Sequence, residues 1–117
     1  MPTPDLERRR APRATVSIPL HLSPRGDAEA ATLVNISASG LCCRFSEAVA
    51  EMTLVGIGVE LPGQGSISEL QGAVVRCDKI RGINPPTYEI GIFFTEMTDA
   101  TRRAIQNFVE SELGPAH

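Results

Sequence analysis

The chain has 117 residues, 42% of them hydrophobic, which fits one compact domain with a single core. The net charge of −3 at pH 7 argues against a general binder of nucleic-acid polymers, because phosphate binding needs a broad basic face. No apolar run approaches the roughly 20 residues that a membrane-spanning helix needs, so direct membrane insertion is not expected.

Residues 1–13 are predicted to form a flexible, arginine-rich N-terminal arm. This stretch has three prolines, four arginines and almost no apolar side chains, so it is expected to be extended and mobile when nothing holds it. It has no hydrophobic segment typical of a secretion signal, which favours a cytoplasmic location. The odd number of cysteines, three, agrees with that location, and no C-x-x-C or histidine cluster indicates a metal site.

Six β-strands are predicted between residues 14 and 95, because apolar and polar residues alternate there with a period of two. In the fifth strand, this alternation puts Ala73, Val75 and Cys77 on one face of the sheet. Val74 and Arg76 are then expected on the opposite face. The six predicted strands are 14–22, 30–36, 41–45, 53–61, 67–78 and 88–95.

One amphipathic helix is predicted at about residues 98–113. Thr98 suits the N-cap position, and Asp99 suits the positive end of the helix dipole. Apolar residues recur at helical spacing at Ile105, Phe108, Val109 and Leu113. Six strands followed by one helix indicate a mainly β fold, in which residues 14–117 form an antiparallel barrel with the helix over an open end.

The polar turn at residues 35–40, with the sequence N-I-S-A-S-G, lies between two apolar runs. Asparagine tolerates the left-handed backbone, serine offers a donor and an acceptor, and glycine permits positive φ or close approach of another group. By itself, the pattern N-x-S-x-x-G is more typical of a hairpin than of a binding site. Its significance depends on the arginines upstream.

Arg9 and Arg13 form an R-x-x-x-R pattern directly before the first predicted strand. Together with N-x-S-x-x-G, in this order and spacing, the pattern resembles the PilZ domain, the bacterial receptor module for cyclic di-GMP. The resemblance extends from about Glu7 to about Leu113, because the segments 72–76 and 88–94 also resemble later strands of that family. It implies a six-stranded antiparallel PilZ-type β-barrel with a C-terminal α-helix.

The resemblance also implies the ligand-binding residues. Arg9 and Arg13 are expected to bind the nucleotide from the arm, and Asn35, Ser37 and Gly40 to shape the guanine pocket. This agrees with the chemistry of arginine. Its planar fork of donors matches phosphate oxygens and the O6 and N7 acceptors of guanine, and the guanidinium plane also stacks on purine faces.

Three further arginines are candidates for contacts with the ligand. Arg8 and Arg10 extend the cationic run, where they either pair with phosphate, stack on a base, or remain solvated. Arg44 follows Gly40 by four residues on the presumed outer face, roughly 13 Å along a strand, which is within reach of a spread ligand. An ordinary surface role for Arg44 is an equal alternative.

The expected function is that of a cyclic di-GMP effector that changes its arm and surface on binding and thereby regulates an unidentified protein partner. No catalytic motif is present, so an enzyme is not expected, and neither is a cofactor or metal. The alternative is a PilZ-like protein-interaction module that binds no nucleotide. A barrel that binds single-stranded nucleic acid is less favoured, since the chain has no Trp and one Tyr for base stacking.

Overall fold

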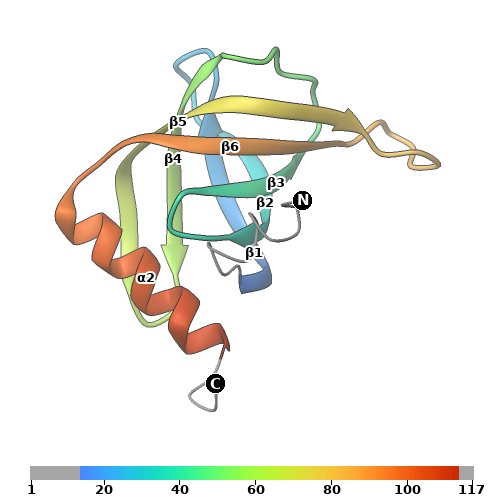
Figure 1. Cartoon of the computed structure of the whole chain (residues 1–117). Helices are drawn as coiled ribbons and strands as arrows, with labels where there is room; N and C mark the ends of the chain where they lie inside the picture. Colours follow the sequence, from blue (N-terminus) through green and yellow to red (C-terminus); the bar gives the residue numbers. More distant parts are fainter. Residues whose placement is uncertain (1–13, 114–117) are drawn as a thin grey trace, which may run out of the picture.

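Six β-strands and one α-helix make up residues 14–113, the part of the chain that the computed structural model describes (Figure 1). The predicted arm, residues 1–13, lies outside this range. Among the described residues, no helix has the length and apolar character needed to span a membrane. The elements are β1 (Ala14–Ser23), β2 (Glu29–Ile36), β3 (Gly40–Phe45), β4 (Leu54–Leu61), β5 (Gly65–Lys79), β6 (Tyr88–Met97) and α2 (Asp99–Leu113).

The strands of residues 14–113 form a closed barrel in the order β1-β2-β3-β6-β5-β4, and each neighbouring pair is antiparallel. The pairing between β1 and β4 is short, since it begins at Leu20, directly after Pro19, and ends at Ser23. Proline lacks the N–H that a further ladder bond needs. The prediction of a mainly β, six-stranded antiparallel barrel with a C-terminal helix is confirmed.

Apolar side chains from every strand of the barrel fill its interior, where Leu33, Ile36 and Cys43 have no exposed surface. Helix α2 lies over one end of the barrel and contacts β1 and β5 (Figure 1). Its buried residues are Thr101, Ile105, Phe108 and Val109. The predicted helical face is therefore correct except for Leu113, the last residue of the helix, which is 39% exposed.

The N-terminus of α2 is capped as predicted from the sequence. The hydroxyl oxygen of Thr98 accepts a hydrogen bond from the backbone N–H of Thr101 at 3.1 Å. This bond satisfies one of the amide groups that have no partner within the first helical turn. The cap fixes where β6 ends and where the chain turns to cover the barrel.

A β-bulge in β5 overturns the alternation predicted for this strand. Val74 lies opposite Ile92 and Arg76 opposite Gly91, so Val75 is an extra residue in β5. Such a bulge reverses the faces of the residues on one side of it. Val74 is consequently in the core, whereas Val75 is 53% exposed on the same outer face as Arg76.

Candidate functional site

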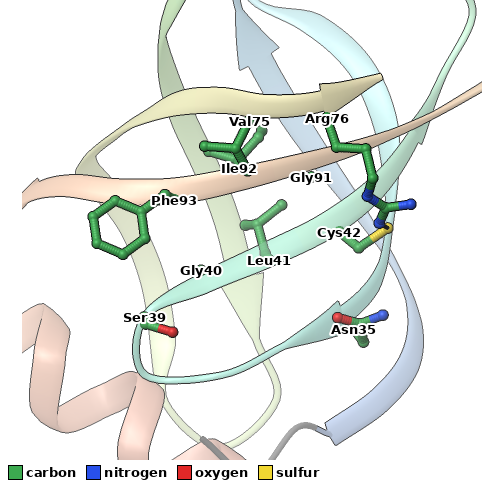
Figure 2. A pocket seen from close by; sticks show the side chains of 10 residues that line it. All are labelled: Asn35, Ser39, Gly40, Leu41, Cys42, Val75, Arg76, Gly91, Ile92 and Phe93. Atoms are coloured by element: carbon green, nitrogen blue, oxygen red, sulfur yellow. Dashed lines mark hydrogen bonds between the residues drawn. The ribbon is translucent and has the colours of Figure 1, made fainter. Parts of the chain in front are cut away.

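A hollow of about 540 Å³ lies on the outer face of the barrel, across the neighbouring strands β2, β3, β6 and β5. Figure 2 labels the side chains that line it. Asn35, Cys42 and Arg76 gather at one end, and Ser39 and Phe93 lie at the other. The hollow therefore contains part of the predicted turn together with residues from two strands far along the sequence.

The register of the barrel brings one residue from each of these four strands into a single row. Asn35 of β2 lies opposite Cys42 of β3, Cys42 lies opposite Gly91 of β6, and Gly91 lies opposite Arg76 of β5. Directly opposite residues in antiparallel strands have Cβ atoms about 5 Å apart. A ligand lying across the row can thus reach residues of all four strands, although at Gly91 it meets the backbone alone.

Ser37 is fully buried and organises the turn at 35–40 from within. Its backbone N–H donates to the carbonyl oxygen of Gly40 at 2.8 Å, and its hydroxyl oxygen accepts from the N–H of Ser39 at 3.3 Å. The hydroxyl also lies 3.4 Å from the carbonyl oxygen of Gly40, to which it can donate. Ser37 does not line the hollow, so its effect on a ligand is through the position of Ser39, which does.

Gly40 is required by the packing of β3 against β6. A Cβ atom at this position would lie 2.3 Å from the backbone carbonyl oxygen of Ile92, a distance that non-bonded atoms do not tolerate. The glycine of the N-x-S-x-x-G pattern therefore has a structural role that does not depend on a ligand. Its lack of a side chain also leaves open the floor of the hollow that it lines.

The Arg76 side chain extends across Gly91, which has no side chain of its own. A Cβ atom on Gly91 would touch the Arg76 side chain at 3.5 Å. The Nη1 atom of Arg76 donates to Oδ2 of Asp78 at 3.0 Å and lies 3.7 Å from Oε1 of Glu89. Two carboxylates thus orient the guanidinium at the edge of the hollow.

These neighbours further stabilise the charged form of Arg76. Burial by itself would lower the pKa of the guanidinium, but the hydrogen bond to Asp78 and the negative charges around it, including Glu89, outweigh burial and raise the pKa above its usual value. Like any arginine, Arg76 is a cation at neutral pH, and its carboxylate partners hold it at the end of the hollow where Asn35 also lies.

Only some of the predicted site residues line the hollow. Asn35 and Gly40 line the hollow, and Ser37 supports it. Arg44 does not line it; its Nε lies 4.0 Å from Oε2 of Glu89. The four arginines of the predicted arm lie outside the described residues: Arg8, Arg9, Arg10 and Arg13.

Sequence reasoning missed several residues that line the hollow, of which Arg76 is the most consequential. Arg76 faces the site because of the bulge at Val75 and because it pairs with Gly91. Neither the bulge nor the pairing can be recognised from a sequence pattern. Phe93 was assigned to a strand without a role, although its place opposite Gly40 puts it at the same site. Only strand pairing reveals either position.

The chemistry of this hollow is that of a binding site for a polar, anionic ligand with flat apolar parts. It combines a cation, an amide and a hydroxyl with the exposed apolar side chains of Val75 and Phe93. Within residues 14–113, no group of three or more His, Cys, Asp or Glu side chains is placed to hold a metal ion.

The family model described as "PilZ domain" matches residues 7–111 of the chain. This match spans most of the 117 residues and includes both the R-x-x-x-R and the N-x-S-x-x-G patterns. No curated protein matches the chain.

Several solved structures have the same fold. The PilZ domain with c-di-GMP of YcgR from Escherichia coli is similar with a TM-score of 0.73 and 15% identity, over 91% of this chain and 92% of that one. The Bacillus subtilis inhibitor of motility, MotI/DgrA, has a TM-score of 0.75 and 16% identity, over 100% of this chain and 59% of that one. The K. pneumonia MrkH–c-di-GMP complex has a TM-score of 0.67 and 17% identity, over 87% of this chain and 51% of that one.

At these identities, the structural matches show the fold alone. The chain spans 59% of the length of MotI and 51% of the length of MrkH in the complex, so it corresponds to only part of those proteins.

Proposed function

This chain belongs to the PilZ domain family, and from this premise we propose that it is a cytoplasmic receptor for cyclic di-GMP that catalyses no reaction. The observation that carries the proposal is the shared hollow, in which Asn35, Ser39 and Gly40 of the N-x-S-x-x-G turn lie with the guanidinium of Arg76. The similar structures of YcgR and MrkH were obtained with c-di-GMP, which supports the choice of ligand.

The R-x-x-x-R pattern is covalently close to this hollow. Arg13 is bonded to Ala14, and Ala14 pairs with Ile36, the residue after Asn35. Arg9 is five residues from Ala14, so its backbone lies at most roughly 18 Å away. Both arginines of the pattern are thus tethered within reach of a ligand in the hollow, which is a dianion with two guanine edges for arginine forks to bind.

In this proposal the site residues have different tasks. Arg9 and Arg13 bind phosphate or guanine edges from the arm, while Asn35, Ser39 and Arg76 contact the ligand from the barrel. Ser37 and Gly40 act by fixing the turn.

The remaining arginines have supporting roles. Arg8 and Arg10 add positive charge to the arm. Arg44 reaches the ligand only if it leaves Glu89, so we assign it a minor role.

We further propose that ligand binding fixes the arm over the turn at 35–40 and so changes the surface that a protein partner recognises. The described barrel is acidic, with seven basic and twelve acidic residues in 14–113, whereas residues 1–13 carry four arginines and two acidic residues. Moving the arm over the hollow and neutralising it with a dianion changes shape and charge together. Among similar proteins, MotI is described as an inhibitor of motility and one MrkH structure as a transcription regulatory factor.

Calorimetric titration of the full chain with cyclic di-GMP tests the receptor function, with cyclic di-AMP and GTP as controls. Saturable binding of cyclic di-GMP is expected, with much weaker binding of cyclic di-AMP, because adenine presents an amino donor where guanine presents O6. Arg13→Ala is expected to weaken binding more than Arg10→Ala, since only Arg13 belongs to the pattern. Equal binding of both dinucleotides, or none, would overturn the proposal, and none would favour a nucleotide-independent interaction module.

Amide hydrogen exchange tests the change in the arm separately. Residues 6–14 are expected to exchange more slowly with cyclic di-GMP than without it. The hinge is expected near Pro12 and Ala14. If calorimetry detects binding but the exchange of this segment is the same in both states, the arm mechanism is wrong while the receptor function stands.

A further inference from the structure

Phe93 is an aromatic residue left open at the edge of the hollow. Its side chain is 53% exposed on the outer face of β6. Its neighbours across the two adjacent strands are Gly40 on β3 and Ala73 on β5, neither of which has a side chain large enough to cover a phenyl ring. The carbonyl oxygen of Ile92 leaves no room for a larger residue at position 40. The packing of β3 against β6 therefore keeps this side of the Phe93 ring uncovered.

The bulged residue Val75 is also 53% exposed, and it lines the same hollow as the ring. Figure 2 shows the ring at the end of the hollow opposite Arg76. Gly91, over which Arg76 lies, and Phe93 are two residues apart on β6, which is about 7 Å along a strand. Gly40 and Gly91 both line the hollow, and neither adds a side chain to it.

We propose that Phe93, together with Val75, forms the packing surface for one guanine base of the bound dinucleotide. This inference rests on the proposed receptor function and extends it to residues outside both sequence patterns. A purine presents a flat face large enough to cover the open ring, and aromatic–base stacking excludes water from both surfaces. Arg76, at the other end of the floor, is then positioned for the anionic backbone or a base edge of the same ligand.

The apolar surface continues beyond the hollow to Leu54, which lies across Ala73 from Phe93 and is 66% exposed. A protein partner that covers this face is therefore the competing occupant. The base is favoured because Phe93 and Val75 line a concavity that also contains Arg76 and Ser39, whereas Leu54 does not line it.

Titration of wild type, Phe93→Ala and Leu54→Ala with cyclic di-GMP distinguishes a guanine base from a protein partner as the occupant of this surface. Phe93→Ala is expected to weaken binding by about tenfold or more, in keeping with the effect of removing one base-stacking aromatic. Leu54→Ala is the matched control, since it removes an exposed apolar side chain from the same face outside the hollow, and it is expected to leave the affinity within about twofold of wild type. Circular dichroism checks that both variants keep the fold.

A tryptophan reporter provides a second, direct readout of stacking. The chain has no Trp, so Phe93→Trp introduces a single one. Guanine stacking on that indole is expected to quench its fluorescence during titration with cyclic di-GMP, whereas the Trp of Leu54→Trp is expected to change little.

The outcomes distinguish this inference from the function on which it depends. If wild type binds cyclic di-GMP, but Phe93→Ala binds equally well and Phe93→Trp is not quenched, the stacking role is wrong and Phe93 belongs to a protein-docking face. If wild type does not bind the ligand at all, the receptor function is wrong, and the stacking role with it.

Discussion

The Nη2 atom of Arg76 lies 3.8 Å from the Sγ atom of Cys42, although the two residues are 34 positions apart in the sequence. The guanidinium thus extends from β5 across β6 to β3. Asp78 and Glu89 hold it there from one side, and Gly91 leaves its path open. This arrangement gives the barrel a fixed cation next to the N-x-S-x-x-G turn, independent of the arginines in residues 1–13.

Replacement of Arg76 is expected to weaken cyclic di-GMP binding. A charge-assisted hydrogen bond contributes about 1.5–3 kcal/mol, so Arg76→Ala is expected to raise the Kd by about tenfold to a hundredfold. Arg44→Ala is the matched control, because both side chains are 50% exposed and both lie near Glu89, but Arg44 does not line the hollow. Calorimetry measures both; an equal loss in the two variants would contradict the role of Arg76.

A large side chain at Gly91 is expected to affect ligand binding more than stability. Gly91→Ala makes only an ordinary contact with Arg76, at 3.5 Å, so it is expected to fold and bind nearly as wild type does. Gly91→Leu is expected to push Arg76 off its path and to fill the floor of the hollow, weakening binding by about tenfold. Thermal unfolding of the same variants, measured beside the titrations, separates an effect on binding from an effect on stability. If Gly91→Leu loses binding only because it no longer folds, the expectation is wrong.

Gly40→Ala is expected to destabilise the protein in the absence of any ligand. The added Cβ would lie 2.3 Å from the carbonyl oxygen of Ile92, and forcing β3 and β6 apart is expected to cost about 1–3 kcal/mol. Gly58→Ala is the control, because the nearest atom to a Cβ there is 3.9 Å away. Urea denaturation without ligand measures both; equal stability of the two variants would show that the glycine of the pattern is not needed for packing.

Stability is expected to fall at alkaline pH because of Cys43. Burial raises the pKa of this thiol to about 12, above its usual value of about 8.5. The contribution of the protonated Cys43 thiol to the free energy of unfolding is fully present below the pKa of the thiol in the unfolded chain. It is lost as the pH rises through the pKa of the thiol in the folded protein. Between pH 9 and 12, the free energy of unfolding is therefore expected to decrease, with Cys43 contributing up to about 1.4 kcal/mol per pH unit.

Cys43→Ala provides the test of this assignment. The variant is expected to be less stable at pH 7, because it leaves a cavity in the core, but its free energy of unfolding is expected to fall less steeply between pH 9 and 11. Parallel curves for the variant and wild type would contradict the assignment to Cys43 and indicate other titrating groups.

The sequence by itself determined the fold class and the turn. Alternation of apolar and polar residues reflects one buried and one exposed face of each strand, so the strand bounds agree with the structure to within two residues. The N-x-S-x-x-G pattern marked the turn correctly, because the hydroxyl of its buried serine accepts a hydrogen bond from the N–H of Ser39 within the turn, a local requirement that residue type reveals. The requirement for glycine at position 40 comes instead from the carbonyl oxygen of Ile92 on β6.

Tertiary structure alone decided which distant side chains join that turn. Arg76 and Phe93 reach the hollow because β6 lies between β3 and β5 in the barrel, an order that no local pattern encodes. The bulge at Val75 then sets which residues of β5 face outward, and a single extra residue exchanges the two faces of a strand. Pairing partners and register are fixed by the packing of the whole core, and for this reason the second half of the site was not predictable from the sequence.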